Sequence, residues 1–136
     1  MAIEILHNSN HVLIEFNYLE SGESWYLTFD KDLKIAIHSF WRFLQNGKIS
    51  WTSKDHNQDY GLLEPIDLQI EIVKLLNNES LLKIERNNLT GDLFLEFSSN
   101  YSIEIFTDSS GYESWEVDIG KRMIIGMAQG EIADFK

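Results

Sequence analysis

The sequence predicts an α+β fold in which a β-rich antiparallel meander, partly barrel-like, packs around one main buried helix at about residues 66–77. Turn-forming residues recur at short intervals, and the segments between them alternate in polarity or are β-branched and aromatic, as expected of short strands. One segment instead carries apolar residues at helical spacing. A chain of 136 residues also has the size of one domain, so we expect residues 1–136 to form a single domain.

Two β-hairpins are predicted in the first half of the chain. The turn of the second is Asn46-Gly47, a strong hairpin signal because both residues tolerate a positive φ. The turn of the first is the sequence Glu-Ser-Gly-Glu. The predicted strands are residues 12–19 with 24–30, and residues 33–44 with 48–52.

The predicted helix begins after Pro65, the only proline, which suits the first turn of a helix. Asp67 then lies near the positive end of the helix dipole. Apolar side chains cover well over half of the helical circumference. We therefore predict that helix 66–77 is largely buried and that either Ile70→Ala or Val73→Ala destabilises the fold.

After the helix, strands are expected at 81–86, 92–97, 101–106, 112–118 and 122–128. The turn near Asn100 fixes the register of one hairpin. A two-residue loop would mix apolar and polar side chains on one face, whereas a three-residue loop pairs Phe97 with Tyr101. We predict the three-residue loop, with Asn100 in the left-handed conformation. The core face then holds Leu93, Leu95, Phe97, Tyr101, Ile103 and Ile105, and the opposite face holds Asp92, Phe94, Glu96, Ser102, Glu104 and Phe106.

Composition excludes several functional classes. The absence of cysteine rules out disulfides, zinc–thiolate sites, iron–sulfur ligation and a thiol nucleophile. A net charge of −11 disfavours nucleic acid and anionic membranes as partners; it serves either solubility alone or attraction toward a basic partner. No signal peptide or membrane span is apparent, so we expect a cytoplasmic protein.

The distribution of charge suggests a binding face. No Lys or Arg lies between Arg86 and Lys121, although many carboxylates and several aromatic residues do. If these carboxylates face the basic segment 33–54, they form internal ion pairs; if they face solvent, they make an acidic, aromatic surface suited to a basic protein partner. The predicted partner-binding residues are Phe94, Glu96, Glu104, Phe106, Asp108, Tyr112, Glu113 and Glu116.

A long polar loop at residues 52–60 offers an alternative site through Asp55, His56 and Asp59. The acidic spacing is similar to the start of a calcium loop, but the glycine and terminal glutamate of such a loop are missing. Asp55 and His56 would point to opposite sides of an extended chain, which disfavours a catalytic dyad. We expect this loop to contact a partner instead.

The remaining histidines give no catalytic or metal motif. His7 and His11 have a spacing that suits a metal on a helix, but the residues between them form a turn. His38 lies in an apolar strand and is interpreted as structural. We therefore expect no enzyme activity, no cofactor and no metal.

Five short segments resemble immunity proteins of bacterial polymorphic toxin and contact-dependent growth inhibition systems. These segments are Trp41-Arg42, Thr52–His56, Pro65–Asp67, Gly91–Leu93 and Ser109–Trp115, and the similarity extends over residues 24–135. The resemblance implies a non-catalytic bacterial protein that binds and neutralises a cognate toxin domain.

The leading hypothesis is an immunity protein whose acidic and aromatic face occludes the basic active site of a toxin domain such as a nuclease. The alternative is a small-ligand-binding domain or weak hydrolase with a site between sheet and helix, using Trp41, Asp55 and His56. A third possibility is a subunit whose exposed strands mediate self-association. The oligomeric state and the toxin's activity do not follow from the sequence.

Overall fold

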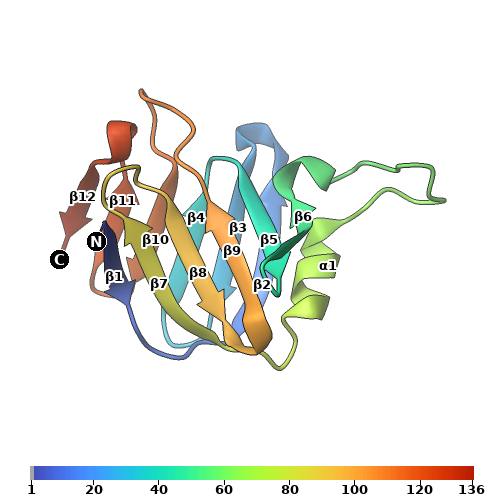
Figure 1. The fold of residues 1–136 in the computed structure, drawn as a ribbon, viewed down its shortest axis with the longest axis horizontal. Helices are drawn as coiled ribbons and strands as arrows, with labels where there is room; N and C mark the ends of the chain where they lie inside the picture. The colour runs from blue at the N-terminus through green and yellow to red at the C-terminus, as the bar shows by residue number, and fades with distance from the viewer. Residues whose placement is uncertain (1) are drawn as a thin grey trace.

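The computed structural model describes residues 2–136, which form twelve strands, one α-helix and four short 3-10 helices (Figure 1). All strand pairs are antiparallel, and they build two six-stranded sheets. Sheet A contains, in spatial order, β1 (Ile3–His7), β7 (Leu81–Asn87), β8 (Leu93–Phe97), β9 (Tyr101–Ile105), β5 (Trp41–Gln45) and β6 (Lys48–Thr52). Sheet B contains β12 (Ile132–Phe135), β11 (Met123–Gly126), β10 (Trp115–Ile119), β4 (Leu33–Ile37), β3 (Ser24–Phe29) and β2 (Leu13–Leu19).

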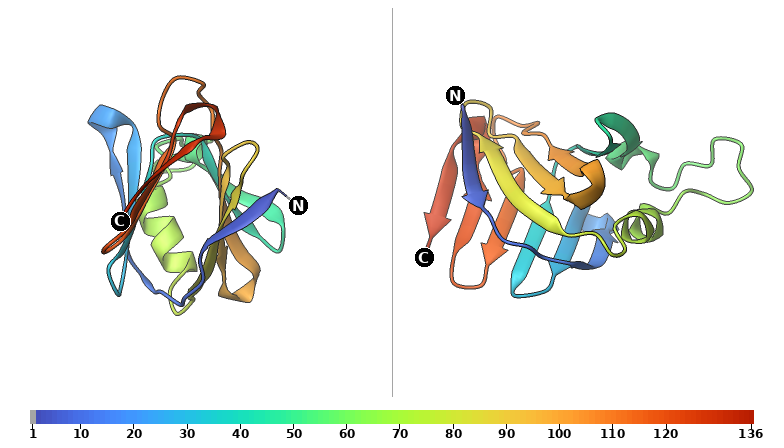
Figure 2. Two further views of the ribbon diagram at one scale, coloured as in Figure 1. Left: turned by 90° about the vertical axis from the view of Figure 1, so that its left-hand side faces the viewer. Right: turned by 60° about the horizontal axis from the view of Figure 1, so that its bottom comes forward.

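The two sheets face each other and share one apolar core (Figure 2). Inward side chains of both sheets fill it, among them the fully buried Trp41 of sheet A and Trp115 of sheet B. The predicted mostly antiparallel fold with one helix is therefore confirmed. The partly barrel-like description is wrong, because the sheets remain open and separate.

The first predicted hairpin is confirmed, because β2 pairs with β3. The second is only partly correct: β5 pairs with β6 across Asn46-Gly47, but residues 33–44 are not one strand. Residues 38–40 instead carry the chain from β4 in sheet B to β5 in sheet A. The odd-numbered residues of both strands point into the core, namely Leu33, Ile35 and Ile37 of β4 and Trp41 and Phe43 of β5. The apolar positions therefore keep the same alternation before and after the crossing.

The helix α1 (Leu68–Leu75) closes one end of the sandwich beside β2 and β6, rather than lying at the centre of the sheets (Figure 1). The Asp67 side chain caps it by accepting a hydrogen bond from the Gln69 N–H at 2.9 Å. Only one face is buried, through Ile66, Leu68, Ile72 and Leu76. The prediction of a largely buried helix is wrong for the outer face, where Ile70 is 61% exposed.

This burial changes the expected effect of helix substitutions. Ile72→Ala should lower the free energy of unfolding by about 2–5 kcal/mol, because it removes fully buried methyl groups and leaves a cavity. Ile70→Ala should change it by less than about 0.5 kcal/mol, because that side chain already contacts water. Denaturant unfolding of both variants measures the difference, and equal losses would contradict this orientation of α1.

The second half of the chain follows the predicted register. Leu95 pairs with Ile103 and Glu96 with Ser102, across the three-residue turn Ser98–Asn100. Asn100 adopts the predicted positive φ of 61°, and Ser99 also has a φ of 59°. Strand β10 begins at Trp115 rather than at residue 112. Strands β1 and β12, at the end of the sandwich opposite α1, were not predicted (Figure 1).

Candidate functional site

The loops that follow β2, β4, β6 and β9 lie together at the top of the sandwich in Figure 1, and they surround two adjacent hollows. The first is lined by residues 38–40 and by residues of three other segments, which are Glu20, Gly22, Glu23, Ser53, Lys54, His56, Asn57 and Asp108. Part of the 20–23 turn and residues from the loop after β9 line the second. Gly22 and His38 line both hollows, so the two hollows adjoin.

Exposed carboxylates surround these hollows. Glu20, Glu23 and Asp108 line the first hollow and Glu113 lines the second. Within residues 2–136, none of the four forms an ion pair. Tyr112 lies beside Glu113 and is 80% exposed. We refer to the surface formed by Glu20, Glu23, Asp108, Tyr112 and Glu113 as the acidic loop end.

The structure separates the predicted partner-binding residues into two groups. Asp108, Tyr112 and Glu113 belong to the acidic loop end, and Glu116 lies nearby on β10, where its carboxylate contacts His38. The other predicted residues lie together on the outer face of sheet A; they are Phe94, Glu96, Glu104 and Phe106.

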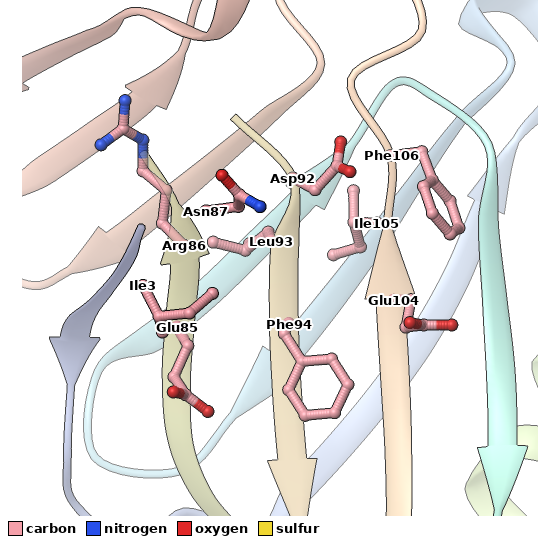
Figure 3. Close-up of a pocket in the computed structure, with 10 residues that line it drawn as sticks. All are labelled: Ile3, Glu85, Arg86, Asn87, Asp92, Leu93, Phe94, Glu104, Ile105 and Phe106. Atoms are coloured by element: carbon pink, nitrogen blue, oxygen red, sulfur yellow. The ribbon is translucent and has the colours of Figure 1, made fainter. Parts of the chain in front are cut away.

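The outer face of sheet A has a third hollow, whose lining includes Phe94, Glu104 and Phe106 (Figure 3). Two carboxylates of this outer face have cationic partners: Arg42 bonds to Glu104, and Lys83 lies 4.0 Å from Glu96. The Arg42 guanidinium also lies over the Phe106 ring, 5.0 Å from its centroid. The internal ion pairs left open by the sequence are thus present here. This face is aromatic, with much of its negative charge matched locally.

A projecting loop extends from the sandwich beside α1 (Figure 2). We define it as residues 57–66. Its base is closed by two backbone hydrogen bonds, from Asn57 N–H to Ile66 O at 2.8 Å and from Ile66 N–H to Gln58 O at 2.9 Å. Its tip is apolar and open to water, with Leu62 60% exposed and Leu63 fully exposed. The base borders the first hollow through Asn57, so the projecting loop adjoins the acidic loop end.

Asp55 and His56 of the alternative loop site make hydrogen bonds that hold the local fold. Asp55 closes a capping box with Thr52 and accepts a hydrogen bond from the Tyr60 hydroxyl at 2.7 Å. The backbone N–H of Leu68 donates to His56 Nδ1 at 3.2 Å. Burial lowers the pKa of His56, although the nearby Asp67 carboxylate acts in the opposite direction.

The other residues named for these alternatives lie apart. Asp59 is exposed in the projecting loop, where it accepts a hydrogen bond from the Gly61 N–H at 3.4 Å. Trp41 is fully buried in the core between the sheets. The structure therefore places these two side chains in different environments, one in water and one inside the sandwich.

One polar chain near the acidic loop end was missed by sequence reasoning. Ser24 Oγ lies 2.7 Å from His38 Nδ1, and His38 Nε2 lies 2.8 Å from Glu116 Oε2. His38 Nε2–H donates to the Glu116 carboxylate, which only accepts hydrogen bonds, and the Ser24 hydroxyl lies between His38 Nδ1 and the Gly22 carbonyl oxygen, to which it donates at 3.1 Å. The three residues come from β3, the crossing after β4, and β10, so no local motif could have joined them. These contacts link the crossing at residues 38–40 to β3 and to β10, the two strands of sheet B that flank β4.

Comparison of the chain with protein-family models, curated proteins and solved structures found no match. Within the described residues 2–136, no helix has the length and apolar character needed to cross a membrane.

Proposed function

We propose that this chain is a non-catalytic immunity protein that binds and neutralises a cognate bacterial toxin domain by occluding a basic active site. The observation that carries the proposal is the acidic loop end, where exposed carboxylates without ion-pair partners among residues 2–136 surround adjoining hollows. The family resemblance and the net charge of −11 support it.

Charge supplies the attraction in this mechanism. A nuclease-like cleft that attracts phosphate through Lys and Arg attracts carboxylates through the same field. Although Lys54 also lines the first hollow, the carboxylates there form no ion pair within residues 2–136, and they project this field more effectively than those of sheet A, which pair with Arg42 and Lys83. The acidic loop end is therefore the part of the predicted surface best suited to orient a basic partner.

Apolar contact supplies the attachment. The projecting loop places Leu62 and Leu63 in water, and burying such side chains against a partner is favourable. Because the loop adjoins the first hollow, one partner can contact its tip and the carboxylates together. The proposed interface thus combines a charged part that guides association with an apolar part that slows dissociation.

The proposal predicts that the gene immediately upstream encodes a secreted protein, and the experiment pairs this protein with the C-terminal domain of that protein. We expect a one-to-one complex in size-exclusion chromatography, and suppression of that domain's toxicity when both are expressed in one cell. A matched control uses the toxin domain of an unrelated system with the same net charge, which should not bind. If the neighbouring domain does not bind, the immunity proposal fails and the small-ligand-binding alternative gains support.

A further inference from the structure

Two histidine rings meet at the end of the sandwich opposite the acidic loop end. His7 ends β1 and His11 follows a short turn, and their Nε2 atoms lie 2.8 Å apart. The ring centroids are 5.0 Å apart, so the two nitrogens point toward each other. Sequence spacing alone disfavoured this meeting, because the histidines are not on a helix; the turn between them brings the rings together instead.

His11 is held rigidly in this pair. Its backbone bonds in both directions to Leu81, with N–H to O distances of 3.1 and 2.7 Å. Its ring is 4% exposed and packs edge-on against Phe29. Its Nδ1 lies 2.9 Å from the Asp30 carbonyl oxygen, which only accepts hydrogen bonds, so Nδ1 carries the proton. In the neutral ring, the Nε2 lone pair therefore faces His7.

The two imidazole rings are arranged as two ligands of a metal site would be. A ligating histidine typically donates its other ring N–H to a carbonyl or carboxylate, which fixes the tautomer and orients the metal-binding nitrogen. His11 makes that bond to Asp30. His7 is only partly buried, so part of the residue is open to water. In the present arrangement His7 Nε2–H donates to His11 Nε2.

We propose that His7 and His11 chelate one late first-row divalent ion, of the class of Cu²⁺, Ni²⁺ or Zn²⁺, through their Nε2 atoms. The ion takes the place of the shared proton, and His7 then carries its proton on Nδ1. With metal–nitrogen bonds of about 2.0 Å, a tetrahedral ion needs the nitrogens roughly 3.3 Å apart, so the His7 ring must move outward slightly. Imidazole donors disfavour Ca²⁺ and Mg²⁺, which prefer oxygen ligands.

The remaining coordination positions belong to water. Within residues 2–136, no group of three or more potential ligand side chains is arranged around one point. A two-ligand site follows the general affinity order, in which Cu²⁺ binds more tightly than Ni²⁺ or Zn²⁺. Binding would fasten β1, an edge strand of sheet A, to a residue whose ring is anchored on the β3–β4 turn of sheet B.

Calorimetric titration of untagged, chelator-treated protein with Ni²⁺ and Zn²⁺ tests the proposal. We expect saturable binding of one ion per chain and a rise in the thermal midpoint, because an ion that binds only the folded state stabilises it. His7→Gln should lose both effects while keeping its fold, because His7 lies on an edge strand and is only partly buried.

His38→Gln serves as the matched control, because it removes an imidazole elsewhere and should bind metal like the parent. The proposal is overturned if the parent shows no saturable binding, or if His7→Gln binds as the parent does. Equal stabilisation by Mg²⁺ would also overturn it, since that ion does not select imidazole.

Discussion

Replacing Glu20 and Glu113 with lysine is expected to slow association with the cognate toxin domain by about tenfold or more at low ionic strength. Each residue lines one of the two adjoining hollows, and neither carboxylate forms an ion pair within residues 2–136. Reversal therefore changes the field of the acidic loop end without breaking an ion pair. The measurement is the association rate at two salt concentrations.

The effect should shrink at high salt, because the screening length falls from about 8 Å at 0.15 M to about 3 Å at 1 M. Glu15→Lys with Asp32→Lys is the matched control. It changes the net charge equally, but Glu15 lies on β2 and Asp32 lies in the turn at the opposite end of the sandwich. If the control pair slows association as much, then overall charge drives binding and the acidic loop end has no special role.

Those parts of the fold that depend on local pattern could be predicted from the sequence. The hairpin of β8 and β9 is an example: only one turn length keeps Phe97 and Tyr101 on the same face, and the structure has that register. The β2–β3 hairpin follows from the same kind of argument. In both cases neighbouring residues and the period of two determine the answer.

Features that depend on distant partners could not be predicted. Apolar residues stand at the same alternate positions before and after Ser39, and only the second sheet reveals that residues 38–40 form a crossing. The helix has apolar residues on most sides, but α1 covers one open end of the sandwich, so Ile70 meets no partner. Strands β1 and β12 are short edge strands whose exposed residues, such as Ile3 and Phe135, weaken the alternating pattern.

The candidate site shows the same limit. The sequence identified Glu104 as acidic and Arg42 as basic, and left open whether they meet; the pairing of β5 with β9 places them side by side. The acidic loop end joins turns that are far apart in the chain, so Glu20 and Glu113 could not be associated by spacing. Charge counting indicated a binding surface, but only the fold shows which carboxylates have no ion-pair partner within residues 2–136.

The second large effect is expected at the tip of the projecting loop. Replacing Leu62 and Leu63 together with serine should weaken toxin binding by roughly tenfold or more, because burying each leucine is worth about 1.5–3 kcal/mol and 1.4 kcal/mol is a tenfold change. The loss should appear mainly as faster dissociation, since apolar anchors hold a complex after charge has guided its formation.

Stability should be nearly unchanged in this variant, within about 0.5 kcal/mol, because both side chains are already exposed to water. Leu89→Ser is the matched control: Leu89 is 78% exposed but lies on the β7–β8 turn, outside the two hollows. Binding kinetics and unfolding curves on the same preparations separate the two effects. Unchanged dissociation in the tip variant would exclude the projecting loop from the interface and leave the acidic loop end, or the aromatic face of sheet A, as the surface that contacts the toxin.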